Sequence, residues 1–178
     1  MLKTNVDRLV KISVVGEVVS PVFGRGIYNI SAQGAPMVLP GVGGITYNVR
    51  VGDPACGWEA DHVEPGVSIE NKENDPRFAQ GANIALNVLA CVGNEAVVVT
   101  GDAKGAKGVV TGKHGGIEHV LVDFQTETLE KLMLGDKVLV KAFGVGLRLL
   151  NYPEIKVMNT DPHFLEALRL KSKGGKLE

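Results

Sequence analysis

The sequence predicts a β-rich α+β protein in which twisted antiparallel or mixed sheets pack against two or three helices. A barrel-like arrangement of these sheets is one form of this fold class. Three observations lead to this prediction. Short runs of aliphatic and β-branched residues recur along the chain, glycines and prolines separate these runs, and few segments carry helix signals. With 178 residues, of which 44% are apolar, the chain is long enough to bury a sizeable core.

The first third of the chain contains runs typical of strands at residues 10–15, 26–30 and 45–51. In the last run, apolar residues at 45, 47, 49 and 51 alternate with polar ones, which predicts a half-buried strand. Residues 33–44 are rich in glycine and proline, so we expect a long irregular loop there.

The clearest helix is predicted to begin at Asp75 and Pro76 and to end near Gly93. An acidic N-cap followed by proline is a helix start signal, and glycine suits the position just after a helix. Its apolar stripe consists of Phe78, Ala82, Ala85, Leu86, Leu89 and Val92. A stripe with several alanines predicts close packing against a sheet.

The second half predicts strands at residues 96–100, 119–124 and 137–143 and a short helix at 126–134. Asp161 and Pro162 repeat the helix start signal, and the polar tail from residue 171 onward is expected to fray. We expect a single domain over residues 1–178. The alternative is a division into a β-rich part with a helix, residues 1–93, and a small β part with a C-terminal helix, residues 94–178.

Composition excludes several classes of partner. Lys and Arg total 19 against 20 Asp and Glu, so no net positive charge attracts nucleic acid, which makes it an unexpected partner. The apolar runs are far shorter than the roughly 20 residues that cross a bilayer, so no membrane association is expected. Two cysteines and no secretory signal predict a cytoplasmic protein.

Residues 101–116, hereafter the glycine-lysine segment, contain six glycines, three lysines and one histidine. Glycines let neighbouring N–H groups converge and lysines add charge, which is how a loop holds an anion. The ligand-binding residues predicted on this basis are Gly101, Lys104, Gly105, Lys107, Gly108, Lys113 and Gly115. His114 is the predicted proton carrier, and a hairpin with solvated lysines is the alternative. The spacing of a P-loop or of a Rossmann fingerprint is absent from the sequence, which excludes those nucleotide sites.

A second candidate site lies in the acidic stretch at residues 59–75, where six acids accompany one lysine. We predict Asp61, His62 and Glu64 as ligands of a divalent metal, with Asp61 also a catalytic residue beside His114. Oxygen ligands with one histidine suit Mg²⁺ or Mn²⁺, and a further histidine such as His114 or His119 would suit Zn²⁺. A solvated acidic loop is the alternative.

Residues 38–49, 57–67 and 101–116 together resemble an uncharacterised prokaryotic family known only as a domain of unknown function. The resemblance extends over most of the chain and implies no assigned activity. Residues 99–110 also resemble the KOW motif of small barrels that attach to ribosomal RNA or to transcription machinery.

These observations lead to three function hypotheses. The first is a cytoplasmic protein that binds a small anionic metabolite, with hydrolase or lyase chemistry if it is an enzyme. The second, implied by the KOW resemblance, is an RNA- or ribosome-associated barrel. The third is a structural homo-oligomer without catalysis. The cofactor is unknown, and a divalent metal is the candidate.

Overall fold

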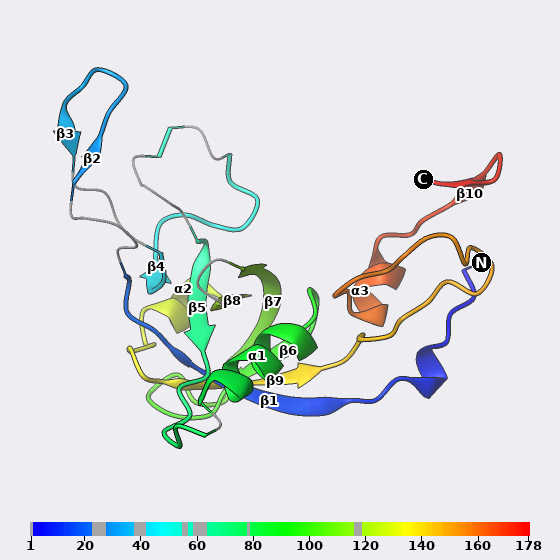
Figure 1. Cartoon of the computed structure of the whole chain (residues 1–178), viewed down its shortest axis with the longest axis horizontal. Coiled ribbons are helices and arrows are strands. Elements are labelled where there is room, and N and C mark those ends of the chain that lie inside the picture. Colours follow the sequence, from blue (N-terminus) through cyan, green and yellow to red (C-terminus); the bar gives the residue numbers. More distant parts are fainter. Residues whose placement is uncertain are drawn as a thin grey trace.

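The computed structural model describes residues 2–22, 28–37, 42–54, 57–58, 64–77, 79–115 and 119–178. Six antiparallel strands close a barrel in the order β1, β9, β6, β7, β8, β5, with β5 paired back to β1. Their bounds are β1 Ile12–Val18, β5 Gly66–Glu70, β6 Glu95–Val98, β7 Lys107–His114, β8 His119–Asp123 and β9 Lys137–Ala142. A short strand, β4 (Ile45–Thr46), pairs with β5 (Figure 1). The predicted β-rich, barrel-like α+β class is confirmed.

The alternation of side chains on β5 and β8 builds the barrel interior. Val67 pairs with Val122 and Ile69 pairs with Val120, and all four side chains are fully buried. Successive residues of a strand point to opposite faces of the sheet. Ser68, which lies between Val67 and Ile69, therefore points to the outer face of the barrel. The same two strands therefore supply core packing on one side and polar groups on the other.

Helix α1 (Ala79–Leu89) packs against β1 and β8, and its Leu86 belongs to the barrel core. Gly16 of β1 makes room for that leucine, because a Cβ at this position would lie 3.0 Å from Leu86 Cδ2 and 3.1 Å from Ile69. The helix begins four residues after the predicted Asp75. The Asp75 carboxylate instead accepts the Arg77 N–H, which belongs to the turn before the helix.

The two other α-helices are α2 (Thr126–Leu129) and α3 (Pro162–Ala167), and a 3₁₀ helix covers Val6–Arg8. Asp161 caps α3 as predicted, accepting the His163 N–H at 2.7 Å. Its other carboxylate oxygen accepts a hydrogen bond from buried Asn94, which also donates to the Phe143 carbonyl. This network ties α3 to the barrel.

A second, smaller apolar cluster joins the two ends of the chain. Leu147, Leu149 and Leu165 are buried there, with Leu2 and Leu9 packed against them. Figure 1 shows both termini on the α3 side, away from the hairpin of β2 (Asn29–Ile30) and β3 (Pro36–Met37). The tail predicted to fray forms a hairpin instead, β10 (Ser172–Lys173) with β11 (Lys176–Leu177), because its polar residues pair through their backbones.

One predicted strand is much shorter than expected, and one strand of the barrel was not predicted. The predicted strand at residues 45–51 ends after Thr46, because the Asp53 carboxylate accepts the Arg50 N–H at 2.7 Å and turns the chain. Strand β5 was missed inside the acidic stretch, although it pairs with both β8 and β1 and so closes the barrel. The barrel takes β1 and β5 from residues 1–93 and the other four strands from residues 94–178.

Candidate functional site

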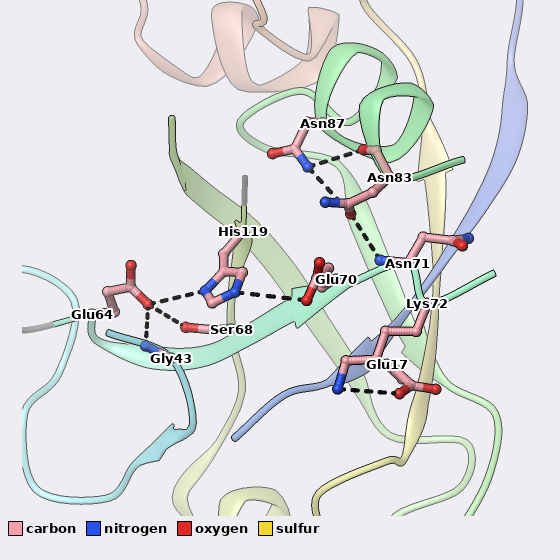
Figure 2. Close-up of polar contacts among 10 residues, drawn as sticks. All are labelled: Glu17, Gly43, Glu64, Ser68, Glu70, Asn71, Lys72, Asn83, Asn87 and His119. Carbon is pink, nitrogen blue, oxygen red and sulfur yellow. Dashed lines mark hydrogen bonds and ion pairs between the residues drawn. The ribbon is translucent and has the colours of Figure 1, made fainter. Parts of the chain in front are cut away.

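A group of polar side chains lies on the outer face of β5 and β8, and we call Glu64, Ser68, Glu70 and His119 the His119 cluster (Figure 2). The strand register extends this row across neighbouring strands. Glu17 of β1 is paired with Glu70, and His114 of β7 is paired with His119. Paired residues of antiparallel strands share a face of the sheet, so four strands contribute titratable groups to one row.

Glu64 is held in place by donors to one of its two carboxylate oxygens. Oε2 accepts the Gly43 N–H at 2.9 Å and the Ser68 hydroxyl at 2.5 Å. Only 5% of the residue is exposed. Burial raises the pKa of Glu64, but the His119 ring, the Ser68 hydroxyl and the Gly43 amide favour the charged form and together lower the pKa below its ordinary value. Glu64 is therefore a buried carboxylate ion.

His119, which is 4% exposed, lies between two carboxylates. Its Nδ1 is 3.8 Å from Glu64 Oε2, and its Nε2 is 4.0 Å from Glu70 Oε2 (Figure 2). Gly43 packs against the ring, since a Cβ at that glycine would lie 3.3 Å from His119 Cε1 and 2.9 Å from the Ser20 carbonyl oxygen. A glycine with φ +102° is thus needed where the loop crosses the histidine.

Two buried polar atoms of the cluster have no hydrogen-bond partner among the described residues. They are Glu64 Oε1 and His119 Nδ1. Buried polar atoms are nearly always hydrogen-bonded, because leaving one unpaired costs about 1–3 kcal/mol. The Nδ1 contact at 3.8 Å is electrostatic only, since a hydrogen bond requires about 3.2 Å or less. Each atom is therefore open to a hydrogen bond that the described residues do not supply.

The polar residues at the far end of β5 serve a structural purpose. The Asn83 side chain accepts the Asn71 N–H at 2.8 Å, and the Asn71 amide donates to the Val15 carbonyl at 2.8 Å. Lys72 forms an ion pair with Glu17 at 3.7 Å. These contacts connect α1 to β1 and β5 and fix the end of the row beyond Glu70 (Figure 2).

The glycine-lysine segment forms a turn followed by β7, and much of its backbone is hydrogen-bonded within the protein. The Gly105 N–H donates to the Val98 carbonyl at 2.8 Å, and the Lys104 N–H donates to Gly101. From residue 107 onward the strand pairs with β6 and β8. Lys107 forms an ion pair with Glu95 at 3.2 Å. These amides thus have partners other than an anion.

Close packing and backbone conformation account for three of the predicted binding glycines. A Cβ at Gly101, where φ is +68°, would lie 2.2 Å from Asp136 Oδ1, and one at Gly108 would lie 2.4 Å from the Asp123 carbonyl oxygen. Gly105 has a φ of +91°, which suits a turn. Gly115 has neither a positive φ nor a heavy atom within 4 Å of an added Cβ, in the part of the chain that is described.

The remaining predicted binding residues occupy different surroundings. Lys104 is exposed, whereas Lys113 is half-buried and donates to Asn159 Oδ1 at 2.8 Å. Burial lowers the pKa of Lys113, and the nearby Cys91 thiol opposes that shift. His114 joins the row of the His119 cluster. Ligand binding by the glycine-lysine segment stays a prediction.

Of the predicted metal ligands, Glu64 belongs to the His119 cluster, whereas Asp61 and His62 lie outside the described residues. Within the described ranges, no group of three or more histidine, cysteine or acidic side chains has metal-binding geometry. Sequence reasoning named His119 only as a conditional ligand and gave Ser68 no role. The alternation of Val67 and Ile69 with Ser68 and Glu70 was the available signal for a strand with one polar face.

The family of the chain follows from comparison with known proteins. A sequence model of the N-terminal domain of DUF4438, described as a domain of unknown function, matches residues 28–166. The chain belongs to this family. The crystal structure of TM1086 is similar, with 52% sequence identity and a TM-score of 0.89, over 98% of this chain and 59% of that one. The resemblance predicted from sequence is confirmed, and the chain spans 59% of the length of TM1086.

Comparison with curated proteins found no match. Over the described parts of the chain, every helix is too short or too polar to cross a membrane.

Proposed function

We propose that the protein binds a small anionic metabolite on the outer barrel face at the His119 cluster and that, as an enzyme, it is a hydrolase or lyase. The observation that carries this proposal is the pair of buried atoms that make no hydrogen bond to any described residue, Glu64 Oε1 and His119 Nδ1. A protein retains such atoms at a cost to stability, so a bound group is their expected partner.

The neighbouring strand supports the same location. His114, the predicted proton carrier, is paired in register with His119, so the hairpin between β7 and β8 brings two histidines to one face. Predicted catalytic Asp61 remains part of the proposal from sequence alone. The lysines of the glycine-lysine segment are the proposed source of further positive charge, with Lys104 exposed to solvent.

Thermal stabilisation by a panel of phosphates and carboxylates tests this proposal. A ligand at 100 times its Kd stabilises the folded state by about 2.7 kcal/mol, which a thermal melt detects easily. We expect some panel members to raise the Tm of the wild type and of Glu95→Gln, an exposed acid of β6, but not of His119→Gln. Equal shifts of Tm in all three proteins would show that the ligand binds outside the His119 cluster.

The homo-oligomer stays a second proposal. An apolar groove of about 460 Å³ is lined by residues that include Leu9, Val10, Ile12 and Phe143, and 75% of Val10 is exposed. Such a surface is available to another subunit. Native mass spectrometry separates this proposal from a monomer, and RNA filter binding across salt concentrations tests the RNA-associated alternative. A cytoplasmic location, in which Cys91 stays a free thiol, is also proposed.

A further inference from the structure

The apolar inner face of the barrel continues beyond the barrel core. Ile12 of β1 is paired with Ala142 of β9, and two residues further along these strands Val14 is paired with Val140. Val140 belongs to the core, and Val14 packs against it. Because side chains on a strand alternate with a period of two, all four residues share one face. The two strands therefore carry this apolar face toward the side of the molecule that holds both termini (Figure 1).

This continuation lines the groove of about 460 Å³. Ile12 and Ala142 belong to its lining, together with Leu89 of α1, Phe143 and the exposed Val10. Sites for small molecules are typically clefts of about 300–1,000 Å³ with a largely apolar lining and a few polar groups, and the mouth of a β-barrel is a frequent place for them. The groove thus has the size, the lining and the place of a small-molecule site.

The polar side chains that line the groove include two cations and, within the described residues, no acid. Arg8 and Arg148 are both exposed there, and neither guanidinium forms an ion pair or a hydrogen bond with a described residue. Asp7, the acid next to Arg8 in the chain, is not part of the lining. A guanidinium is always charged and binds carboxylate or phosphate oxygens through its planar fork of N–H groups. The charge of the groove is therefore complementary to an anion.

Asn5 holds together the two segments that carry these arginines. Its side-chain amide donates to the Gly146 carbonyl at 3.0 Å, and its Oδ1 accepts the Arg148 N–H at 2.8 Å. Asn5 directly precedes the 3₁₀ helix that contains Arg8. These bonds fix that helix beside the turn at residues 144–148 without using either guanidinium. Removal of the two charges should therefore leave the shape of the groove intact.

We propose that this groove binds a small amphipathic anion, in which an apolar chain ends in a carboxylate or a phosphate. The chain lies against Val10, Ile12 and Phe143, and Arg8 and Arg148 receive the anionic head group. The groove shares no residue with the His119 cluster, so the inference does not rest on the proposed anion site there. A second copy of the chain is the competing occupant of the groove.

Calorimetric titration of the full chain with matched compounds tests the inference. Octanoate has both the chain and the anionic head group, acetate has the head group alone, and octylamine has the chain with the opposite charge. We expect octanoate to bind at least tenfold more tightly than either, with a gain of two- to fourfold for each methylene from butanoate to octanoate. Equal binding of octanoate and octylamine would indicate an unspecific apolar surface and would overturn the inference.

Octyl phosphate distinguishes the two head groups. Binding of octanoate or of octyl phosphate supports the site, and the tighter of the two identifies the anionic group. Failure of both to bind would overturn the inference.

Variants locate the bound octanoate. The double variant Arg8→Gln with Arg148→Gln should bind at least tenfold more weakly than the wild type, and Val10→Ser at least threefold more weakly. The matched controls Lys131→Gln and Met133→Ser follow α2 and should bind as the wild type does. All five side chains are exposed, so we expect the variants to fold, and the ligand series on the wild type covers one that does not. Equal affinity in all variants would place octanoate elsewhere and overturn the assignment.

Two further outcomes separate the groove from the other proposals. His119→Gln should bind octanoate as the wild type does, whatever its response to the panel of phosphates and carboxylates. Loss of octanoate binding in His119→Gln but not in the double arginine variant would overturn the inference. A second copy in the groove predicts a dimer in native mass spectrometry that Val10→Ser dissociates and that does not bind octanoate. That result would also overturn the inference.

Discussion

The glycine-lysine segment and the His119 cluster lie on the same barrel, and the sequence directs attention to the first of them. In the segment, backbone N–H groups donate to carbonyls of the turn and of neighbouring strands, and Lys107 pairs with Glu95. In the cluster, two buried atoms have no hydrogen bond among the described residues. A glycine-rich stretch therefore indicates where the backbone turns or packs closely. A functional surface is better indicated by buried polar atoms to which the described fold gives no hydrogen bond.

The largest expected effect on stability comes from a glycine of the glycine-lysine segment. Gly108→Ala places a Cβ 2.4 Å from the Asp123 carbonyl oxygen and 2.7 Å from the Phe124 ring. We expect a loss of about 3 kcal/mol in the free energy of unfolding, because the backbone must shift. Gly115→Ala, which meets no atom within 4 Å in the described structure, should stay within about 0.5 kcal/mol of wild type.

Urea denaturation of both variants measures this difference. An anion-binding role for these glycines predicts the opposite pattern, in which both variants fold normally and both lose ligand-dependent stabilisation.

Gly43→Ala tests the loop that crosses His119. The added Cβ would lie 2.9 Å from the Ser20 carbonyl oxygen and press on the His119 ring, so we expect a loss of about 2 kcal/mol. Gly52→Ala is the matched control, because its φ of +94° is similar but no atom of the described residues lies within 4 Å of the Cβ position. It should lose about 1 kcal/mol, from backbone strain alone. Thermal melts that rank Gly52→Ala as the worse variant would contradict the described packing.

Ser68→Ala removes a donor from the buried Glu64 carboxylate. We expect a loss of about 1.5 kcal/mol, because Gly43 then remains the only described donor to Oε2. Ser13→Ala, at an exposed position of β1, is the control and should leave the free energy of unfolding unchanged. Chemical denaturation decides, and an effect no larger than that of the control would mean that the Ser68 contact contributes little.

The smallest expected effect belongs to Lys107→Ala. The pKa of Glu95 is lowered by hydrogen bonds from Lys141 and Lys107. Stabilisation from a lowered carboxyl pKa is present above the unfolded-state pKa and is lost as pH falls through the folded-state pKa. The small difference in Tm between wild type and variant should therefore vanish in acid, and also in high salt because the pair is exposed.

Should Lys107 bind an anion instead, Lys107→Ala would keep its basal Tm near that of the wild type and lose the stabilisation given by phosphate. A melt with and without phosphate at neutral pH distinguishes these outcomes.

Local patterns predicted much of the fold. Alternating and aliphatic runs indicated β1, β6, β8 and β9, and the proline signal placed the start of α3 at its observed residue. The start of α1 was placed too early, because Asp75 caps a turn rather than the helix. Strand β5 escaped because it is short and flanked by acids, and its place in the barrel depends on pairing with β1 and β8, which lie far away in sequence.

The candidate site was only partly predictable for the same reason. Glu64 was identified from the acidic stretch, but its meeting with His119 requires the β5–β8 pairing, and the approach of Gly43 requires the loop before β4. His114 and His119 are five residues apart in the sequence, a spacing that does not by itself place them side by side. The hairpin between β7 and β8 does bring them opposite each other.

Calorimetric titration of the full chain with the phosphates and carboxylates that raise its Tm tests the central claim most directly. We predict that the wild type and Glu95→Gln bind at least one of these anions with equal affinity and that His119→Gln binds it about tenfold more weakly or worse. Equal affinity in all three proteins would contradict the claim that the His119 cluster is the binding surface.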